Sequence, residues 1–220
     1  RFKRYRMQSK IILLTTAILI FVPAIFFFVC DFGQVSIGKR TLLSLFQSVT
    51  TRTAGFNTAD LSSMTEAGQA IMILLMLIGG SPSSTAGGMK TTTAAALLLN
   101  AFATFRSRED AGAFGRRFDG QVIKNAATIA MLYFVLFFFG GITISVYEGL
   151  SLQLCLYEAA SAVGTVGLTL GITPGLHILS RLILIMLMYL GRVGGLTLIY
   201  AVLSRRNMNA KMPLEKITVG

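Results

Sequence analysis

Two short stretches decide the fold of this chain: TAGFN at residues 53–57 and TVGLT at residues 165–169. They stand at equivalent places in two largely apolar halves. Aligning LFQSVT at 45–50 with LYEAAS at 156–161 brings them into near register, with one extra residue in the second copy. Self-similarity of this kind indicates one structural unit used twice. The glycine in each stretch permits a bend with φ > 0.

The composition indicates an integral membrane protein. Hydrophobic residues make up 54% of the chain, charged residues 13%, and the mean hydropathy is +0.70. Residues 11–30, 67–89 and 125–147 carry no charge, and residues 182–203 carry only Arg192. Each run approaches the ~20 apolar residues that a helix needs to cross a bilayer. We therefore expect four membrane crossings.

The basic residues are arranged with respect to a membrane. Lys and Arg number five in residues 1–10, five in 104–124 and four in 204–220, against three in 31–64 and one in 148–181. The positive-inside rule then places both termini and the central connector in the cytoplasm. This arrangement explains the net charge of +11 without a nucleic acid as partner.

Each repeat contains a segment too short to span the membrane. The segments Thr41–Thr51 and Leu150–Val163 must enter and leave on one side. Irregular backbone at that depth is tolerated where it lines a water-filled path, so the stretches that follow should face a pore. The alternative is a pair of surface loops rich in Thr and Gly. The first interpretation divides the chain into two helix–pore-loop–helix repeats, residues 1–120 and 121–220.

Residues 79–88 interrupt the second apolar run of the first repeat. Four glycines and a proline fall there before helical composition resumes at Thr91–Phe105. Such residues disfavour a continuous helix, and we predict a flexible intramembrane loop beneath the pore. Met89 separates the last glycine from Lys90, so the nucleotide-binding P-loop pattern is not met.

Arg192 lies well inside the last apolar run, where a charge is costly unless it is paired or reaches water. It should therefore face the protein interior. Two interpretations stay open: an arginine that bonds loose carbonyls to stabilise packing, or one that anchors the loop at 79–88 and repels cations there.

Few residues offer catalytic or metal chemistry. Cys30 and Cys155 stand in apolar surroundings, and His177 is the sole histidine, so neither a disulfide framework nor a metal site is indicated. A serine of the interrupted run, such as Ser84, together with Lys90 leaves open an intramembrane Ser-Lys hydrolase.

Several ordered motifs resemble the Trk/Ktr/HKT potassium transporters, and within them the bacterial KtrB-type membrane subunit. They are TTRTAGFNT at 50–58, the run 79–93, GTVGL at 164–168 and GRVG at 191–194. The resemblance implies an all-α membrane protein with a K⁺-channel-like pore of four pseudo-equivalent hairpins. This chain looks like the third and fourth, the C-terminal half of a subunit about twice as long, unless two copies pair.

The resemblance also implies which residues act. Main-chain oxygens would hold K⁺ as they do in channel filters. The filter residues would be Thr53, Ala54, Gly55, Phe56, Thr165, Val166, Gly167 and Leu168, and the gate residues Gly79, Gly80, Ser84, Thr85, Gly87, Gly88 and Arg192.

The family implies further partners and a location. These are a bacterial plasma membrane, a homodimer of complete subunits and a KtrA-like cytoplasmic ring that binds nucleotides, with Na⁺ dependence common. The basic connector and the tail at 215–220 are candidate contact surfaces for the ring. Because only two filter repeats are present, a non-conducting membrane scaffold remains the alternative.

Overall fold

A computed structural model describes residues 5–108 and 110–194. The helices and strands in chain order are α1 (Met7–Cys30), α2 (Ile37–Thr50), η2 (Leu61–Ser63), α3 (Glu66–Leu77), α4 (Thr91–Phe105), β1 (Gly112–Ala113), β2 (Arg116–Arg117), α5 (Gly120–Glu148), α6 (Leu152–Val163), η3 (Thr173–Gly175) and α7 (Ile178–Val193).

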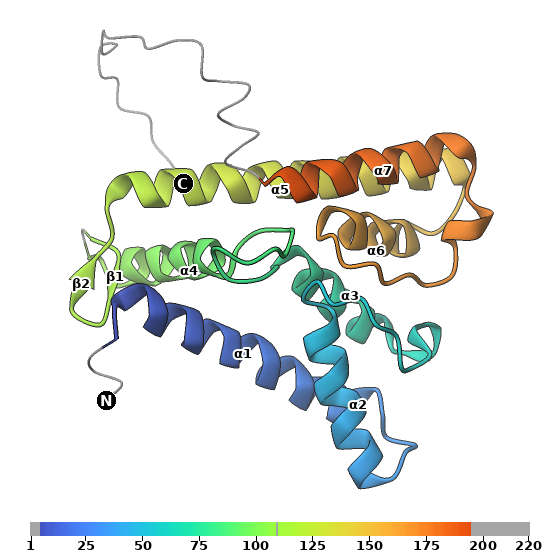
Figure 1. Cartoon of the computed structure of the whole chain (residues 1–220), viewed down its shortest axis with the longest axis horizontal. Coiled ribbons are helices and arrows are strands. Elements are labelled where there is room, and N and C mark those ends of the chain that lie inside the picture. The colour runs from blue at the N-terminus through green and yellow to red at the C-terminus, as the bar shows by residue number, and fades with distance from the viewer. Residues whose placement is uncertain (1–4, 109, 195–220) are drawn as a thin grey trace, which may run out of the picture.

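The two halves of the chain form two helical groups that pack against each other. In the first, α1 contacts α2, α3 and α4; in the second, α5, α6 and α7 all contact one another. The contacts α3–α6 and α4–α5 join the groups. Figure 1 shows α5 and α7 along one side of the molecule and α1 along the other, with α4 between them.

Two helices in the described part of the chain are long and apolar enough to cross a membrane: α1, with 24 residues, and α5, with 29. Both begin a few residues before the uncharged runs seen in the sequence. The fourth apolar run, 182–203, is described only as far as residue 194, so its full length lies outside the described residues.

The helix break predicted in the first half is present. Helix α3 ends at Leu77, and α4 begins at Thr91 and ends at Phe105, the bounds expected from composition. Thr65 caps α3, since its hydroxyl accepts the N–H of Gly68 at 3.0 Å. The intervening residues are non-helical, as their glycines and proline require.

The core lies where the two groups meet, around α6. Every residue from Tyr157 to Val163 on this helix is buried, and Met72 and Met76 of α3 belong to the same apolar cluster. A side-chain hydrogen bond from Gln153 to Gln69, 2.9 Å long, crosses the same boundary. The C-terminal half of α6 is therefore surrounded by protein.

A small hairpin departs from the all-helical expectation. Strands β1 and β2 pair antiparallel in the connector, with Gly112 opposite Arg117. Phe114 and Gly115 form the turn with φ of 53° and 75°. Positive φ at both central residues suits the right-handed twist of a two-residue hairpin. In the sequence, this segment stood out only for its basic residues, and no hairpin was predicted there.

Candidate functional site

The two glycine stretches share an unusual backbone. We call residues 53–56 the first bend and residues 165–168 the second bend. Positive φ occurs at Thr53 (64°) and Gly55 (75°) in the first, and at Thr165 (52°) and Gly167 (96°) in the second. A threonine in the left-handed region is uncommon. The same alternation of φ sign at matching positions indicates a shared and constrained geometry.

Each bend follows directly on the end of a short helix. The N–H of Gly55 donates to the carbonyl of Thr50 at the end of α2, at 3.1 Å. The N–H of Val166 donates to the carbonyl of Ser161 near the end of α6, at 2.9 Å. The N–H of Ala54, which matches Val166 in the alignment of the bends, also donates to the Thr50 carbonyl, at 3.2 Å. The C-terminal ends of α2 and α6 thus both lead into a bend, where their dipoles contribute partial negative charge.

Most carbonyls of the bends are free of hydrogen bonds. Among the described residues, the carbonyl of Phe56 accepts the hydroxyl of Thr50 at 2.7 Å, whereas no hydrogen bond ends on the other seven predicted filter carbonyls. Phe56 was predicted to aim its carbonyl at an ion, and that oxygen is engaged here.

The bends lie against each other. A Cβ added at Gly55 would collide with the carbonyl of Val166 and lie 3.6 Å from the Cα of Gly167. A Cβ at Gly167 would meet nothing within 4 Å. Segments far apart in the sequence therefore meet at Gly55, and only glycine fits there.

Glu158 fixes the outer end of the second bend. This α6 side chain is 4% exposed. Its Oε1 accepts the Thr169 hydroxyl at 2.6 Å and the Leu170 N–H at 3.0 Å, and its Oε2 accepts the Thr173 hydroxyl at 2.8 Å. The sequence alone indicated no role for Glu158. Its partners lie in the segment 169–173, and the path of that segment back onto α6 is visible only in the structure.

The aligned position in the first repeat holds Gln47, which is fully buried. Its amide N–H₂ reaches the sulfur of Met72 at 3.5 Å, and its Oε1 has no partner among the described residues. The aligned side chains Gln47 and Glu158 therefore have different kinds of partner: Gln47 contacts α3, whereas Glu158 contacts the residues that follow the second bend.

The non-helical residues between α3 and α4 form a closed loop. The Gly79 N–H donates to the Met89 carbonyl at 2.8 Å, and the Met89 N–H donates to the Leu77 carbonyl at 3.0 Å. The Thr91 N–H donates to the Gly80 carbonyl at 3.1 Å. The chain therefore enters and leaves side by side. We call residues 79–88 the intramembrane loop.

The intramembrane loop contacts the second bend, the residue that precedes the first bend, and the last helix. The Gly87 N–H donates to the Thr165 hydroxyl at 3.1 Å, and Arg52, next to the first bend, donates from Nη2 to the Gly79 carbonyl at 3.2 Å. Arg192 of α7 donates from Nη1 to the Thr85 carbonyl. The structure thus brings the predicted gate residues together with the predicted filter residues.

A cavity of about 330 Å³ lies between these parts. Its lining joins both bend threonines, the intramembrane loop and two cationic side chains: Arg52, Thr53, Gly80, Ser84, Thr85, Ala86, Thr165 and Arg192. Two guanidinium groups therefore border the space directly beside the bends.

The geometry around Lys90 does not make a nucleophile. Its ammonium donates to the carbonyls of Ala86 at 2.6 Å and Ser84 at 3.3 Å, while the Ser84 hydroxyl donates to the Ser81 carbonyl. Within residues 5–108 and 110–194, no group of His, Cys, Asp and Glu could hold a metal ion, and Cys30 and Cys155 are free.

The chain matches a family of cation transport proteins. The chain belongs to the TrkH family, described as "Cation transport protein", whose sequence profile matches residues 7–211. The family expected from the motifs is confirmed. Because this is a family of transporters, the hydrolase alternative is wrong.

Curated relatives agree with this assignment. The chain is 36% identical to the potassium/sodium uptake protein NtpJ of Enterococcus hirae and 31% identical to the Ktr system potassium uptake protein B of Bacillus subtilis. Each alignment covers 100% of this chain and 51% of the relative. The chain therefore spans about half the length of the curated relatives it matches.

A solved structure shares the fold. The potassium transporter TrkH from Vibrio parahaemolyticus superposes with a TM-score of 0.71 at 20% identity, over 89% of this chain and 44% of that one.

Proposed function

We propose that this chain forms half of the pore of a potassium uptake subunit and contributes two of four filter segments. The observation that carries the proposal is the repeated alternation of φ at Thr53, Gly55, Thr165 and Gly167, with seven bend carbonyls left without hydrogen bonds among the described residues. Carbonyl oxygens arranged in this way can replace the hydration shell of a K⁺ ion.

Cations rather than anions fit this site. The bends follow the C-terminal ends of α2 and α6, whose partial negative charge favours a cation. The names of relatives support K⁺, and one of them adds Na⁺, so Na⁺ is proposed as a second ion that the full-length protein handles. No nucleotide is proposed on this chain.

The intramembrane loop acts as the gate in this proposal. It lies against Thr165 and is held by Arg52 and Arg192, whose charges border the cavity beside the bends. A cation that meets two guanidinium groups is repelled by their positive charges. Conduction then requires the loop and Arg192 to move away together.

A complete pore needs the other half of a full-length protein. Two bends surround an ion on one side only, and the matched relatives are about twice as long. We propose that two further hairpins close the ring, that complete subunits pair as a homodimer, and that a cytoplasmic nucleotide-binding ring regulates them. Both ends of this chain then face the cytoplasm of a bacterial cell, and the tail at 215–220 lies outside the described residues.

The test is K⁺ transport by the full-length protein in a bacterial strain that lacks its own K⁺ uptake. We expect growth at low K⁺ and ⁸⁶Rb⁺ uptake that excess K⁺ suppresses. A membrane scaffold would insert normally yet rescue no growth and take up no Rb⁺, and that outcome would reject the proposal.

Deletion of residues 81–87 tests the gate. The chain can close over this gap because the Gly79 N–H and the Met89 carbonyl are already 2.8 Å apart. We expect higher basal Rb⁺ uptake at equal expression. Uptake no higher than wild type would contradict the assignment of this loop as the gate. It would not bear on the assignment of the filter residues.

A further inference from the structure

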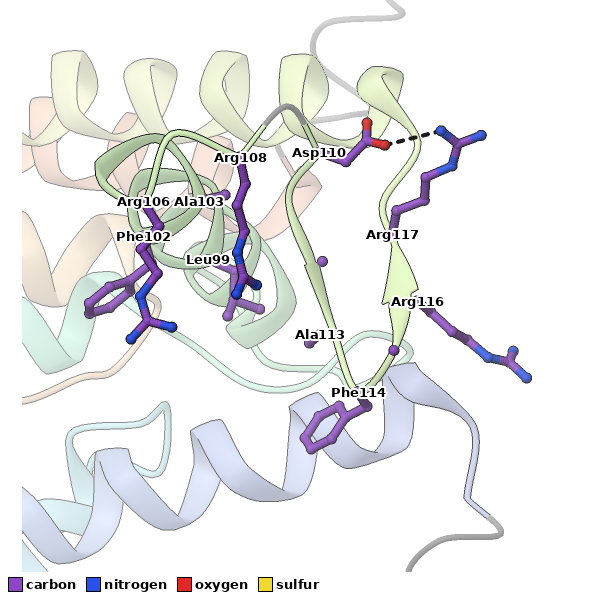
Figure 2. A pocket seen from close by; sticks show the side chains of 12 residues that line it. Leu99, Phe102, Ala103, Arg106, Arg108, Asp110, Ala113, Phe114, Arg116 and Arg117 are labelled. Atoms are coloured by element: carbon purple, nitrogen blue, oxygen red, sulfur yellow. Dashed lines mark hydrogen bonds and ion pairs between the residues drawn. The ribbon is translucent and has the colours of Figure 1, made fainter.

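A second cavity lies away from the bends, in the basic connector. It measures about 620 Å³ and opens between the end of α4 and the β1–β2 hairpin (Figure 2). Four arginines and Asp110 line it. Arg117 is paired with Asp110 at 3.1 Å, and Figure 2 shows Arg116 pointing away from the hairpin.

Arg106 and Arg108 are the cations that remain for a ligand. Both extend from the end of α4 in the same direction in Figure 2. Asp110–Arg117 is the single ion pair found among the described residues, so neither of these two guanidinium groups has a carboxylate partner there. The Lys10 ammonium lies 5.5 Å from the ring of Phe114, at the hairpin turn. The cavity is therefore strongly cationic on one side.

An apolar groove continues from this cavity. It has a volume of about 280 Å³ and runs between α1 and α4, with walls that include Ile11, Leu14, Leu98, Leu99, Phe102 and Phe114. Leu99, Phe102 and Phe114 line both spaces. The combined site has a charged end and an uncharged end, which matches a molecule with an anionic head and a hydrocarbon tail.

We propose that this site binds an anionic phospholipid of the surrounding membrane. Arg106 and Arg108 bind the headgroup phosphate, because each planar guanidinium donates paired N–H groups to the phosphate oxygens. One acyl chain lies in the groove between α1 and α4.

The position on the helix supports a lipid over a water-soluble phosphate. The α4 side chains Leu98, Phe102 and Phe105 are 61%, 62% and 85% exposed, and Arg106 follows immediately. A change from exposed apolar side chains to arginine along a helix indicates the level of the lipid headgroups. At that level, basic pockets between helices bind anionic lipids. The inference does not depend on ion conduction.

The experiment measures lipid retention by native mass spectrometry of the purified full-length protein. Palmitoyl-oleoyl phosphatidylglycerol and phosphatidylcholine are titrated separately, and inorganic phosphate at millimolar concentration is added as a competitor. We expect phosphatidylglycerol to be retained in preference, and to remain bound with phosphate present because the acyl chain contributes to its affinity.

The variants assign the binding to named residues. Arg106→Gln with Arg108→Gln should weaken phosphatidylglycerol binding about twentyfold, and Arg108→Gln alone about fivefold. Arg116→Gln removes the same charge from the hairpin but should leave binding within about twofold. The proposal would be overturned if both lipids were retained equally, or if inorganic phosphate displaced the lipid. It would also be overturned if the Arg106 and Arg108 variants bound as well as wild type, or if Arg116→Gln lost as much binding as they do.

Discussion

Gly87 donates its backbone N–H to the Thr165 hydroxyl over 3.1 Å, so the intramembrane loop is bonded directly to the second bend. The contact is tight as well as polar, since a Cβ on Gly87 would collide with the Thr165 side chain. Any displacement of the loop must break this bond. The proposed gate and the proposed filter are thus in immediate contact.

Gly87→Ala should push the intramembrane loop off the second bend. Forcing a methyl group into a filled space costs about 1–3 kcal/mol, so the closed arrangement loses about tenfold in population against an open one. We expect basal ⁸⁶Rb⁺ uptake to rise. Gly33→Ala is the matched control, because a Cβ there meets nothing within 4 Å. Equal uptake by both variants would argue against a closed loop.

Gly55→Ser and Gly167→Ser should differ in severity. Both positions have positive φ, where a side chain costs about 1–2 kcal/mol. At Gly55 the new Cβ also meets the Val166 carbonyl, whereas at Gly167 the space is open. We expect both substitutions to relax K⁺ over Na⁺ selection in a flux assay, with Gly55→Ser the stronger. Wild-type selectivity in Gly55→Ser would contradict the filter assignment.

Arg192→Gln should release the intramembrane loop from α7. The substitution removes both the charge and the guanidinium geometry that meets the Thr85 carbonyl. Hydrogen bonds from charged donors contribute about 1.5–3 kcal/mol, so basal uptake should increase by about tenfold or more. Arg192→Lys keeps the charge and should show a smaller rise, measured at equal expression. If Lys and Gln raise uptake equally, repulsion by the charge is not part of the gate.

Glu158→Ala should loosen the second bend and destabilise the protein. It leaves the Leu170 N–H and the Thr169 and Thr173 hydroxyls without their acceptor. Hydrogen bonds to charged groups contribute about 1.5–3 kcal/mol each, and water can offset part of that loss at the exposed Thr169. We expect a lower thermal midpoint in detergent and weaker K⁺ selection. Glu158→Gln retains one acceptor oxygen and should lie between Ala and wild type. A normal midpoint and normal selectivity in Glu158→Ala would exclude the positioning role.

The sequence predicted the helical architecture where residue type controls local conformation. The bounds of α4 and the break before it follow from the glycines and proline at 79–88, which cannot continue a helix. Helices α1 and α5 begin earlier than the uncharged runs because spanning helices continue into polar surroundings. The β1–β2 hairpin escaped prediction because its turn places Phe114 in a conformation that phenylalanine rarely adopts.

The candidate site was predictable in its glycines but not in its side-chain contacts. Duplication of the glycine stretches marked both bends. Arg192 was expected to face the protein interior because of the cost of a charge in the membrane; in the structure it contacts the Thr85 carbonyl but is exposed. The roles of Glu158 and Arg52 depend on loops that return from distant positions, which one sequence does not encode locally. The bond from Thr50 to the Phe56 carbonyl joins residues close in the sequence, but it forms only because of the positive φ values in the bend between them.

The central claim is that carbonyls of the two bends hold the transported ion. Its most direct test is a crystal structure of the full-length protein soaked in Tl⁺ or Rb⁺, with the anomalous signal used to locate the heavy cation. We expect a peak enclosed by the main-chain oxygens of residues 53–55 and 165–168. A strong peak bound elsewhere, with none between the bends, would contradict the account.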